Sequence, residues 1–418
     1  MPLSDALNPS RFTDDTVPLL VKGYAWLPDR RRRAQGAMVR TRLLARPTVA
    51  LRGPEAARFF YDEAHVRRHG AIPEPVQSTL FGHGAVHDLD GAAHRVRKSL
   101  FTSLMTADRV TALADGAASA WDRAVQEWAE QPRIVLFDEA ARVLTAAVYD
   151  WTGVPLDPAD LDGTAQDLVA MVDGFATPGP RHWRARRTRT RQERRTAAFV
   201  AEVRRGAAKA PADSPADAVL RHHGVDGEAL DTHTAGVELL NLLRPTVAVS
   251  WFVAYAAHAL HRWPEHRARL RDGDGGFATA FAHEIRRFYP FAPFVGGRAV
   301  RDLDWQGEHI PAGATVLLDV YGQNHDPALW DRPYAFRPQR FADGGIDPFT
   351  LIPQGGGDPG AGHRCPGEDI TVAVLRTLAI RLARLDYRVP EQNLAIPLHR
   401  IPSRPLSGMV LADVRAPG

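Results

Sequence analysis

The chain's single cysteine, Cys365, lies in a glycine- and proline-rich loop, GGGDPGAGHRCPGE, at residues 355–368. One cysteine in 418 residues excludes an intramolecular disulfide and any site that needs several cysteine ligands. Gly362 and Gly367 allow backbone N–H groups to approach the sulfur, and a helix starting near Pro366 places its positive end beside it. This is how a thiolate metal ligand is presented. Taken alone, a single cysteine favours a buried structural thiol, so the assignment of Cys365 depends on the rest of the sequence.

The hydrophobic pattern predicts a mainly α-helical fold with a minor β component, in one domain spanning residues 1–418. Apolar residues make up 44% and charged residues 24% of the chain, as in globular proteins. A hairpin is expected near Arg40 to Arg52, short strands at 297–301, 304–311 and 314–319, and a helix ending near Leu385. The other predicted helices are 54–64, 91–103, 108–129, 137–151, 157–173, 190–205, 228–261 and 277–288.

The most apolar stretch runs from Ala235 to Ala257 and contains Glu238, Arg244 and Pro245. Charges and a proline inside it indicate a buried helix rather than a membrane span. The N-terminal residues also lack the basic and apolar pattern of a signal peptide. The sequence therefore predicts a soluble, cytoplasmic protein.

The basic residues gather in two clusters, Arg30 to Arg33 and eight arginines between Arg181 and Arg195. Such clusters attract anions, including nucleic acids, or form solvated helix faces. No DNA-binding motif or interleaved aromatic residues accompany them, so we expect a solvated face and no nucleic-acid partner.

Three further motifs precede the cysteine loop. Glu284-Ile-Arg-Arg287 has an i, i+3 spacing that places acid and base on one helix face. It is followed by Asn324-His-Asp-Pro327 with Trp330, and by Phe336-Arg-Pro-Gln-Arg-Phe341. In this order, and together with His363-Arg-Cys-Pro-Gly367, they resemble the cytochrome P-450 superfamily. One departure is Ala361, which stands where the family has a glycine.

The resemblance implies a P-450 fold with haem b held between the long central helix and the cysteine loop. Cys365 would be the axial iron ligand, so this reading prevails over the structural thiol. Glu284, Arg287 and Arg340 would form the family's structural ion network. The haem propionates would be held by four basic residues: His94, Lys98, Arg298 and His363.

The central helix departs from oxygen-activating members of the superfamily. Where they carry an acid–alcohol pair that delivers protons, this chain has Arg244-Pro245. Pro245 should kink the helix. Arg244 is a cation in an apolar segment with no acid within one turn, so it needs a partner. We expect a substrate carboxylate in that role, with a distant acid or a propionate as the alternative.

The Arg-Pro pair, the GGGD-containing loop and the segment Ser78 to Asp90 resemble the bacterial fatty-acid peroxygenase and decarboxylase branch. That resemblance implies an enzyme that uses H2O2 directly, without a redox partner, and oxidises long-chain fatty acids at Cα or Cβ. The bound carboxylate would replace the missing acid–base pair. Candidate walls of the acyl tunnel are four aromatic residues: Phe81, Phe175, Phe291 and Phe294.

His87 bears on the products. The alkene-forming relative has His at the matching place, whereas relatives that mainly hydroxylate tend to have Gln. An imidazole with a pKa near 6.5 could donate a proton beside the reacting carbon. We therefore expect terminal alkenes alongside α- and β-hydroxy acids, the alternative being that His87 only holds the loop. Competing functions are an O2- and NAD(P)H-dependent monooxygenase that needs redox partners and a non-catalytic haem protein.

Overall fold

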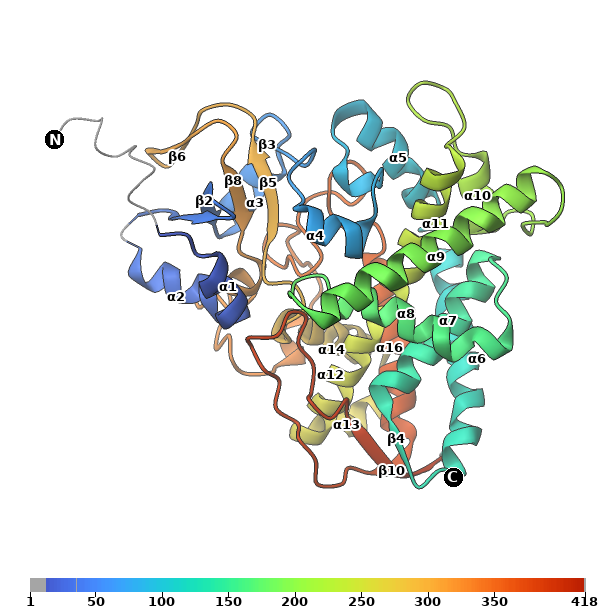
Figure 1. The fold of residues 1–418 in the computed structure, drawn as a ribbon. Helices are drawn as coiled ribbons and strands as arrows, with labels where there is room; N and C mark the ends of the chain where they lie inside the picture. The colour runs from blue at the N-terminus through green and yellow to red at the C-terminus, as the bar shows by residue number, and fades with distance from the viewer. Residues whose placement is uncertain (1–12, 35, 417–418) are drawn as a thin grey trace.

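The computed structural model describes residues 13–34 and 36–416. The main sheet lies at the upper left of Figure 1, whereas β4 and β10 of a second sheet, with the order β4-β10-β9, lie at the bottom, and helices form most of the rest. The early strands β1 (Val39–Leu43) and β2 (Arg46–Leu51) lie beside the late strands of the same sheet. The predicted mainly α fold with a minor β component is confirmed.

The helical core is built from amphipathic helices whose apolar faces meet in one cluster. α16 (Glu368–Arg384), which follows the cysteine loop, packs against α6 (Ala107–Ala129), α12 (Val249–Arg262) and α14 (Gly275–Phe288). α7 (Leu136–Thr152) packs against α6 and α12. The remaining α-helices are α1 (Thr16–Lys22), α2 (Trp26–Arg33), α3 (Pro54–Tyr61), α4 (Glu74–Val76), α5 (Gly91–Ser103), α8 (Leu161–Asp173), α9 (Pro180–Arg204), α10 (Pro215–Arg221), α11 (Thr232–Val247), α13 (Glu265–Arg271) and α15 (Val320–Asn324).

The main sheet has the strand order β1-β2-β8-β5-β3. β1 and β2 form the expected hairpin, and β2 pairs in parallel with β8, with Thr48 opposite Thr315. The other strands are β3 (Val66–Arg67), β4 (Arg133–Val135), β5 (Val295–Ala299), β6 (Leu303–Trp305), β7 (Glu308–Ile310), β8 (Thr315–Leu318), β9 (Asp386–Arg388) and β10 (Val410–Arg415). The predicted strand 304–311 is wrong in one respect, because it is two strands, β6 and β7, joined by a turn at Gln306-Gly307.

The predicted long central helix is two helices, α11 and α12, separated at Ala248. Pro245 has no N–H to donate, and the break follows it within one turn. The combined stretch Thr232–Arg262 has the length and hydropathy of a membrane span, but 94% of its most apolar window is buried inside the protein. The expectation of a buried core helix therefore agrees with the structure.

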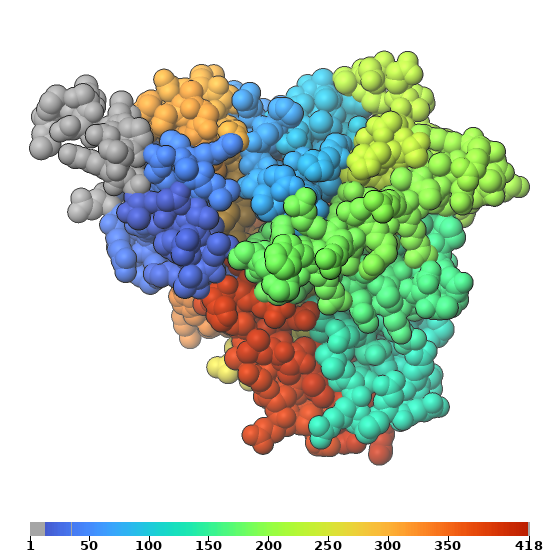
Figure 2. Space-filling view, viewed as in Figure 1, coloured from blue at the N-terminus to red at the C-terminus, as the bar shows by residue number. Residues whose placement is uncertain are grey.

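The predicted start of helix 190–205 is wrong, since α9 begins ten residues earlier, at Pro180. Its first half is rich in exposed arginines and carries no apolar periodicity that would reveal a helix. Figure 2 shows α9 in green across the face of the molecule, between the blue N-terminal helices and the teal helices. Several of its arginines, among them Arg184, Arg187 and Arg194, are exposed, as expected for a solvated face.

Candidate active site

The cysteine loop holds its sulfur just before a helix. Cys365 is half-buried, and its N–H donates to the carbonyl oxygen of Gln354 at 3.0 Å. Gly355 has φ 99°, and a Cβ there would lie 2.7 Å from the hydroxyl of Tyr61, so only glycine fits this close turn. Burial raises the pKa of the Cys365 thiol, while the Gly367 N–H and the Lys98 charge lower it. A bound metal cation would complete this arrangement by holding the thiolate form.

Arg244 of α11 is 6% exposed. Within residues 13–34 and 36–416, its guanidinium makes no hydrogen bond or ion pair, and its Nε is buried without a partner. Its carbon Cζ lies 5.9 Å from the ring centre of Phe81. Burial and the nearby charge of Arg189 lower the pKa of Arg244 to about 9, while the Cys365 thiolate raises it. A buried guanidinium without a counter-charge is costly, so this site calls for an anion.

The nearest acid in the sequence, Glu238, is occupied elsewhere. Its carboxylate accepts from Arg97 at 2.8 Å, from the side chain of Asn241 at 3.0 Å and from the N–H of Val86 at 2.8 Å. No ion pair joins Arg244 to a distant acid in the part of the chain that the structure describes, which removes that alternative.

His87 lies beside this guanidinium, in the short turn Val86–Asp88. Its ring packs against Phe81 with ring centres 4.3 Å apart, and its Nδ1 is buried without a partner among the described residues. Burial lowers the pKa of His87 well below its usual range, and the charge of Arg244 lowers it further. The expectation of a pKa near 6.5 is therefore wrong for the ligand-free protein, where the imidazole is neutral.

Of the four predicted propionate ligands, two meet directly. The rings of His94 and His363 stack with centres 3.8 Å apart. Lys98 is buried and donates to the carbonyl oxygens of Gly362 and Arg364, so it also braces the cysteine loop. Arg298 on β5 is half-buried, and its Nε donates a hydrogen bond to the carbonyl oxygen of Gly70.

The predicted tunnel walls separate into groups. Phe81 lies at Arg244 and His87. Phe291 packs against Phe252 of α12 with ring centres 5.0 Å apart, whereas Phe294 meets Trp26 of α2 at 6.1 Å. Phe175 follows α8 and is half-buried, and no ring contact joins it to the other three among the described residues. The structure thus brings one of the four next to the buried cation.

These residues fit a haem. Cys365 as a residue is half-buried, and the buried Nδ1 atoms of His87 and His94 lack partners among the described residues. α12 packs against α16, whereas α11, which carries Arg244, packs against α7, α8 and α9. The cations around His94 and His363 suit the two propionate carboxylates.

Sequence reasoning missed two arginines that shape this region. Arg189, one of the eight clustered arginines, is buried and donates to the carbonyl oxygens of Leu80 and Phe81 at 3.0 and 2.9 Å. Arg68 is buried and donates to the carbonyl of Gly296 at 2.7 Å; burial lowers the pKa of His94 and His363, and the charge of Arg68 lowers it further. The sequence around Arg189 and Arg68 resembles that around exposed arginines, so their burial could not be recognised from the sequence.

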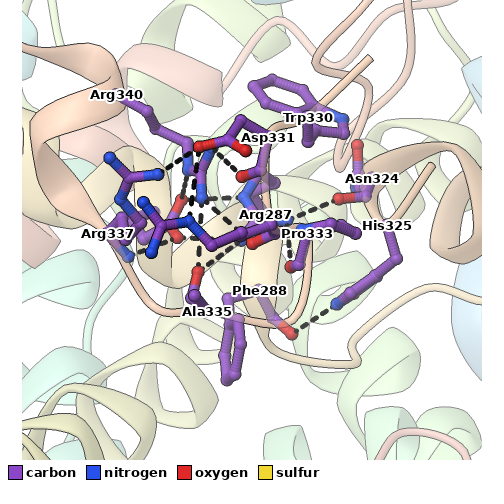
Figure 3. A network of polar contacts seen from close by, with 12 residues as sticks. Arg287, Phe288, Asn324, His325, Trp330, Asp331, Pro333, Ala335, Arg337 and Arg340 are labelled. Carbon is purple, nitrogen blue, oxygen red and sulfur yellow. Dashed lines mark hydrogen bonds and ion pairs between the residues drawn. The ribbon is translucent and has the colours of Figure 1, made fainter. Parts of the chain in front are cut away.

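The predicted ion network is assembled on α14, as Figure 3 shows. Glu284 and Arg287 form two hydrogen bonds of 2.8 Å, and Arg340 lies 3.1 Å from Glu284. Arg287 also donates to the carbonyl oxygens of Asn324 and Pro333. Glu284 and Arg287 are buried, so the network ties α14 to the segment that leads toward the cysteine loop.

Comparison with known proteins agrees with this architecture. The family model for cytochrome P450 matches residues 276–395. Solved structures of two proteins illustrate the similarity over nearly the whole chain. Cytochrome P450SP alpha (CYP152B1) is 40% identical, with 97% of this chain and 100% of that chain covered and a TM-score of 0.94. Ligand-free cytochrome P450 OleT is 35% identical, with 96% and 97% covered and a TM-score of 0.93.

The chain belongs to the cytochrome P450 superfamily. The two neighbours also confirm the branch that the sequence motifs indicate. Curated relatives match over shorter segments. The monooxygenase okaD of Penicillium ochrochloron is 36% identical over 25% of this chain, and cytochrome P450 4X1 of Homo sapiens is 29% identical over 44%. These matches span 18% and 39% of the relatives' own lengths. As a cytochrome P450, the protein is a haem-iron oxidoreductase.

Proposed function

We propose that the protein is an H2O2-dependent peroxygenase that oxidises long-chain fatty acids at Cα and Cβ. The observation that carries this proposal is the buried Arg244, which has no counter-charge among the described residues. A fatty-acid carboxylate supplies one and can be bound through two parallel N–H donors. Because the head group is then fixed beside the haem, the first carbons of the chain are the ones presented for reaction.

In this proposal Cys365 ligates the iron, and His94, Lys98, Arg298 and His363 hold the propionates, together with Arg68. Haem bound through a thiolate supplies the oxidising chemistry. The protein's own residues bind and orient the fatty acid and exclude water from the site. Pro245 occupies the place of a proton-delivering alcohol, so the carboxylate oxygen beside Arg244 is the acid–base group that takes and returns the peroxide proton.

Two bound acids support a carboxylate ligand. Cytochrome P450SP alpha has been solved with (R)-ibuprophen, and a variant of OleT with arachidonic acid. Both ligands are carboxylic acids with a large apolar part. Burying about a dozen methylenes contributes on the order of 10 kcal/mol before ordering costs. The acyl chain thus supplies most of the affinity, and Arg244 sets the position.

Product analysis tests the proposal directly. Haem-loaded protein is mixed with H2O2 and a saturated long-chain fatty acid, without a reductase, and the products are separated by gas chromatography. Hydroxy acids or terminal alkenes are expected. If turnover instead requires O2, NAD(P)H and redox proteins, the chain is a partner-dependent monooxygenase.

We also propose that the protein acts as one domain in the cytoplasm, without a redox partner.

Replacing His87 by Gln should lower the share of terminal alkene relative to hydroxy acids. The imidazole lies against Phe81 and beside Arg244, where it can donate a hydrogen bond next to the bound carboxylate. The measurement is the alkene-to-hydroxy-acid ratio at equal total turnover. An unchanged ratio would show that His87 only fills space.

The value of kcat/KM should show no inflection near pH 6.5 that depends on His87. The pKa of His87 is lowered well below that value, so the free enzyme carries a neutral imidazole between pH 6 and 8. Since kcat/KM reports the ionisations of the free enzyme, its profile is the appropriate measurement. An acid limb near pH 6.5 in the unmodified enzyme that disappears in the His87→Gln variant would contradict this assignment.

A further inference from the structure

A side-chain amide reaches the sulfur from the loop that precedes it. The Nε2 of Gln354 lies 3.8 Å from the Sγ of Cys365, within the reach of an N–H···S contact. The same nitrogen lies 3.0 Å from the Oγ1 of Thr371 on α16. Gln354 is half-buried and also accepts the backbone N–H of Cys365 at 3.0 Å. One residue therefore holds both the main chain and the sulfur of Cys365.

The surrounding donors determine which way the amide points. Arg286 on α14 donates its Nε to the Oε1 of Gln354 at 2.9 Å, and a guanidinium can only donate. The amide oxygen must therefore face Arg286, and the NH2 group must face Thr371 and Cys365. The hydroxyl of Thr371 contacts the carbonyl of Gly367 at 3.2 Å, which takes its proton and leaves a lone pair for the amide. The second amide hydrogen is free for the sulfur.

Arg286 is itself held in place and neutralised. It is 1% exposed and donates to Glu368, which also accepts from Arg364 at 2.7 Å. Its Nη1 contacts the ring of His283 at 3.0 Å. A fixed cation on the oxygen side of an amide polarises it and makes its N–H a stronger donor. The result is a buried chain of contacts from α14 to the sulfur.

We propose that Gln354 is a positioning residue that hydrogen-bonds the Cys365 thiolate and sets its electron donation to iron. The inference rests on Cys365 being the ligand in the proposed function. Hydrogen bonds to a ligating sulfur withdraw electron density and raise the reduction potential of the metal. Backbone N–H groups near Cys365 also withdraw electron density from the sulfur. The Gln354 amide adds a further donor, whose direction is set by Arg286.

Replacing Gln354 by leucine removes the donor and keeps a side chain of similar size. In haem-loaded protein, we expect the ferric–ferrous midpoint potential to become more negative and the iron–sulfur stretching frequency to rise. The first is measured by spectroelectrochemistry and the second by resonance Raman spectroscopy. An unchanged potential and stretching frequency in Q354L would overturn the proposal.

Thr371→Val is the second variant, and it leaves the amide in place without one of its acceptors. It should shift both quantities in the same direction by a smaller amount, and Thr371→Ser should restore them. If T371V shifts the potential as much as Q354L, the amide acts only by packing and the proposal fails. The carbonyl spectrum of the unmodified ferrous protein tests thiolate ligation separately, so failure of the proposed function is distinguishable.

Discussion

The Arg244→Met variant should lose about 30- to 4,000-fold in kcat/KM for a long-chain fatty acid, because truncating a buried partner of a charge pair costs about 2–5 kcal/mol. The ligand-free variant should at the same time unfold at a higher denaturant concentration. Methionine removes a guanidinium that has no counter-charge among the described residues. The measurements are peroxide-driven product formation and urea unfolding.

Two comparisons make this result specific. Arg404→Met removes another enclosed guanidinium, which lies over the ring of Phe137 at 3.7 Å, and it should leave kcat/KM nearly unchanged. A fatty alcohol of equal chain length has no carboxylate, so its turnover should respond little to Arg244→Met. If R244M retains full activity toward the acid, the carboxylate is bound elsewhere and the proposed function loses its anchor.

The Glu284→Ala variant should be about 3–5 kcal/mol less stable than the unmodified protein. Glu284 is buried and is the acid that faces both Arg287 and Arg340, so its removal leaves two cations uncompensated. The free energy of unfolding is measured by urea titration of the haem-loaded protein. Glu127→Ala, which removes a half-exposed partner of Arg142, is the matched surface control and should cost about 1 kcal/mol or less.

Glu284→Gln separates charge from hydrogen bonding in the same network. The amide oxygen still accepts from Arg287, so this loss should be smaller than that of Glu284→Ala. A loss below about 1 kcal/mol in Glu284→Ala would contradict the buried network as a source of stability.

The sequence predicted those parts of the molecule that depend on short patterns. The Glu284-to-Arg287 spacing, the cysteine loop and the apolar periodicity of α5 to α8 are local, and each lies where the pattern placed it. The sequence also showed that Arg244 has no acid within one turn of its helix, but only the structure excluded an ion pair with a distant acid among the described residues. The start of α9 was not predictable, since its arginines face water and give no periodic signal.

Contacts between segments far apart in the chain could not be predicted from the sequence. Gln354 meets Arg286 and Thr371 only because the loop folds between α14 and α16. The lowered pKa of His87 depends on its burial and on a cation from α11. Phe294 is a predicted tunnel wall, and the contact of its ring with Trp26 of α2 was not visible in the sequence. In each case the amino-acid type could be interpreted from the sequence, but the neighbouring residue that determines its role could not be predicted.

The contacts of Arg189 with the short π-helix Gln77–Phe81 determine which side chains can change beside Arg244. Its two hydrogen bonds end on the main-chain oxygens of Leu80 and Phe81, so they do not depend on which side chains stand there. Position 81 can therefore exchange one ring or alkyl group for another while the π-helix keeps its course. The next position is closed to such exchange. Gly82 has φ 84°, and a Cβ there would lie 2.2 Å from the Nη2 of Arg189. Residue 81 can therefore vary, whereas residue 82 must remain glycine.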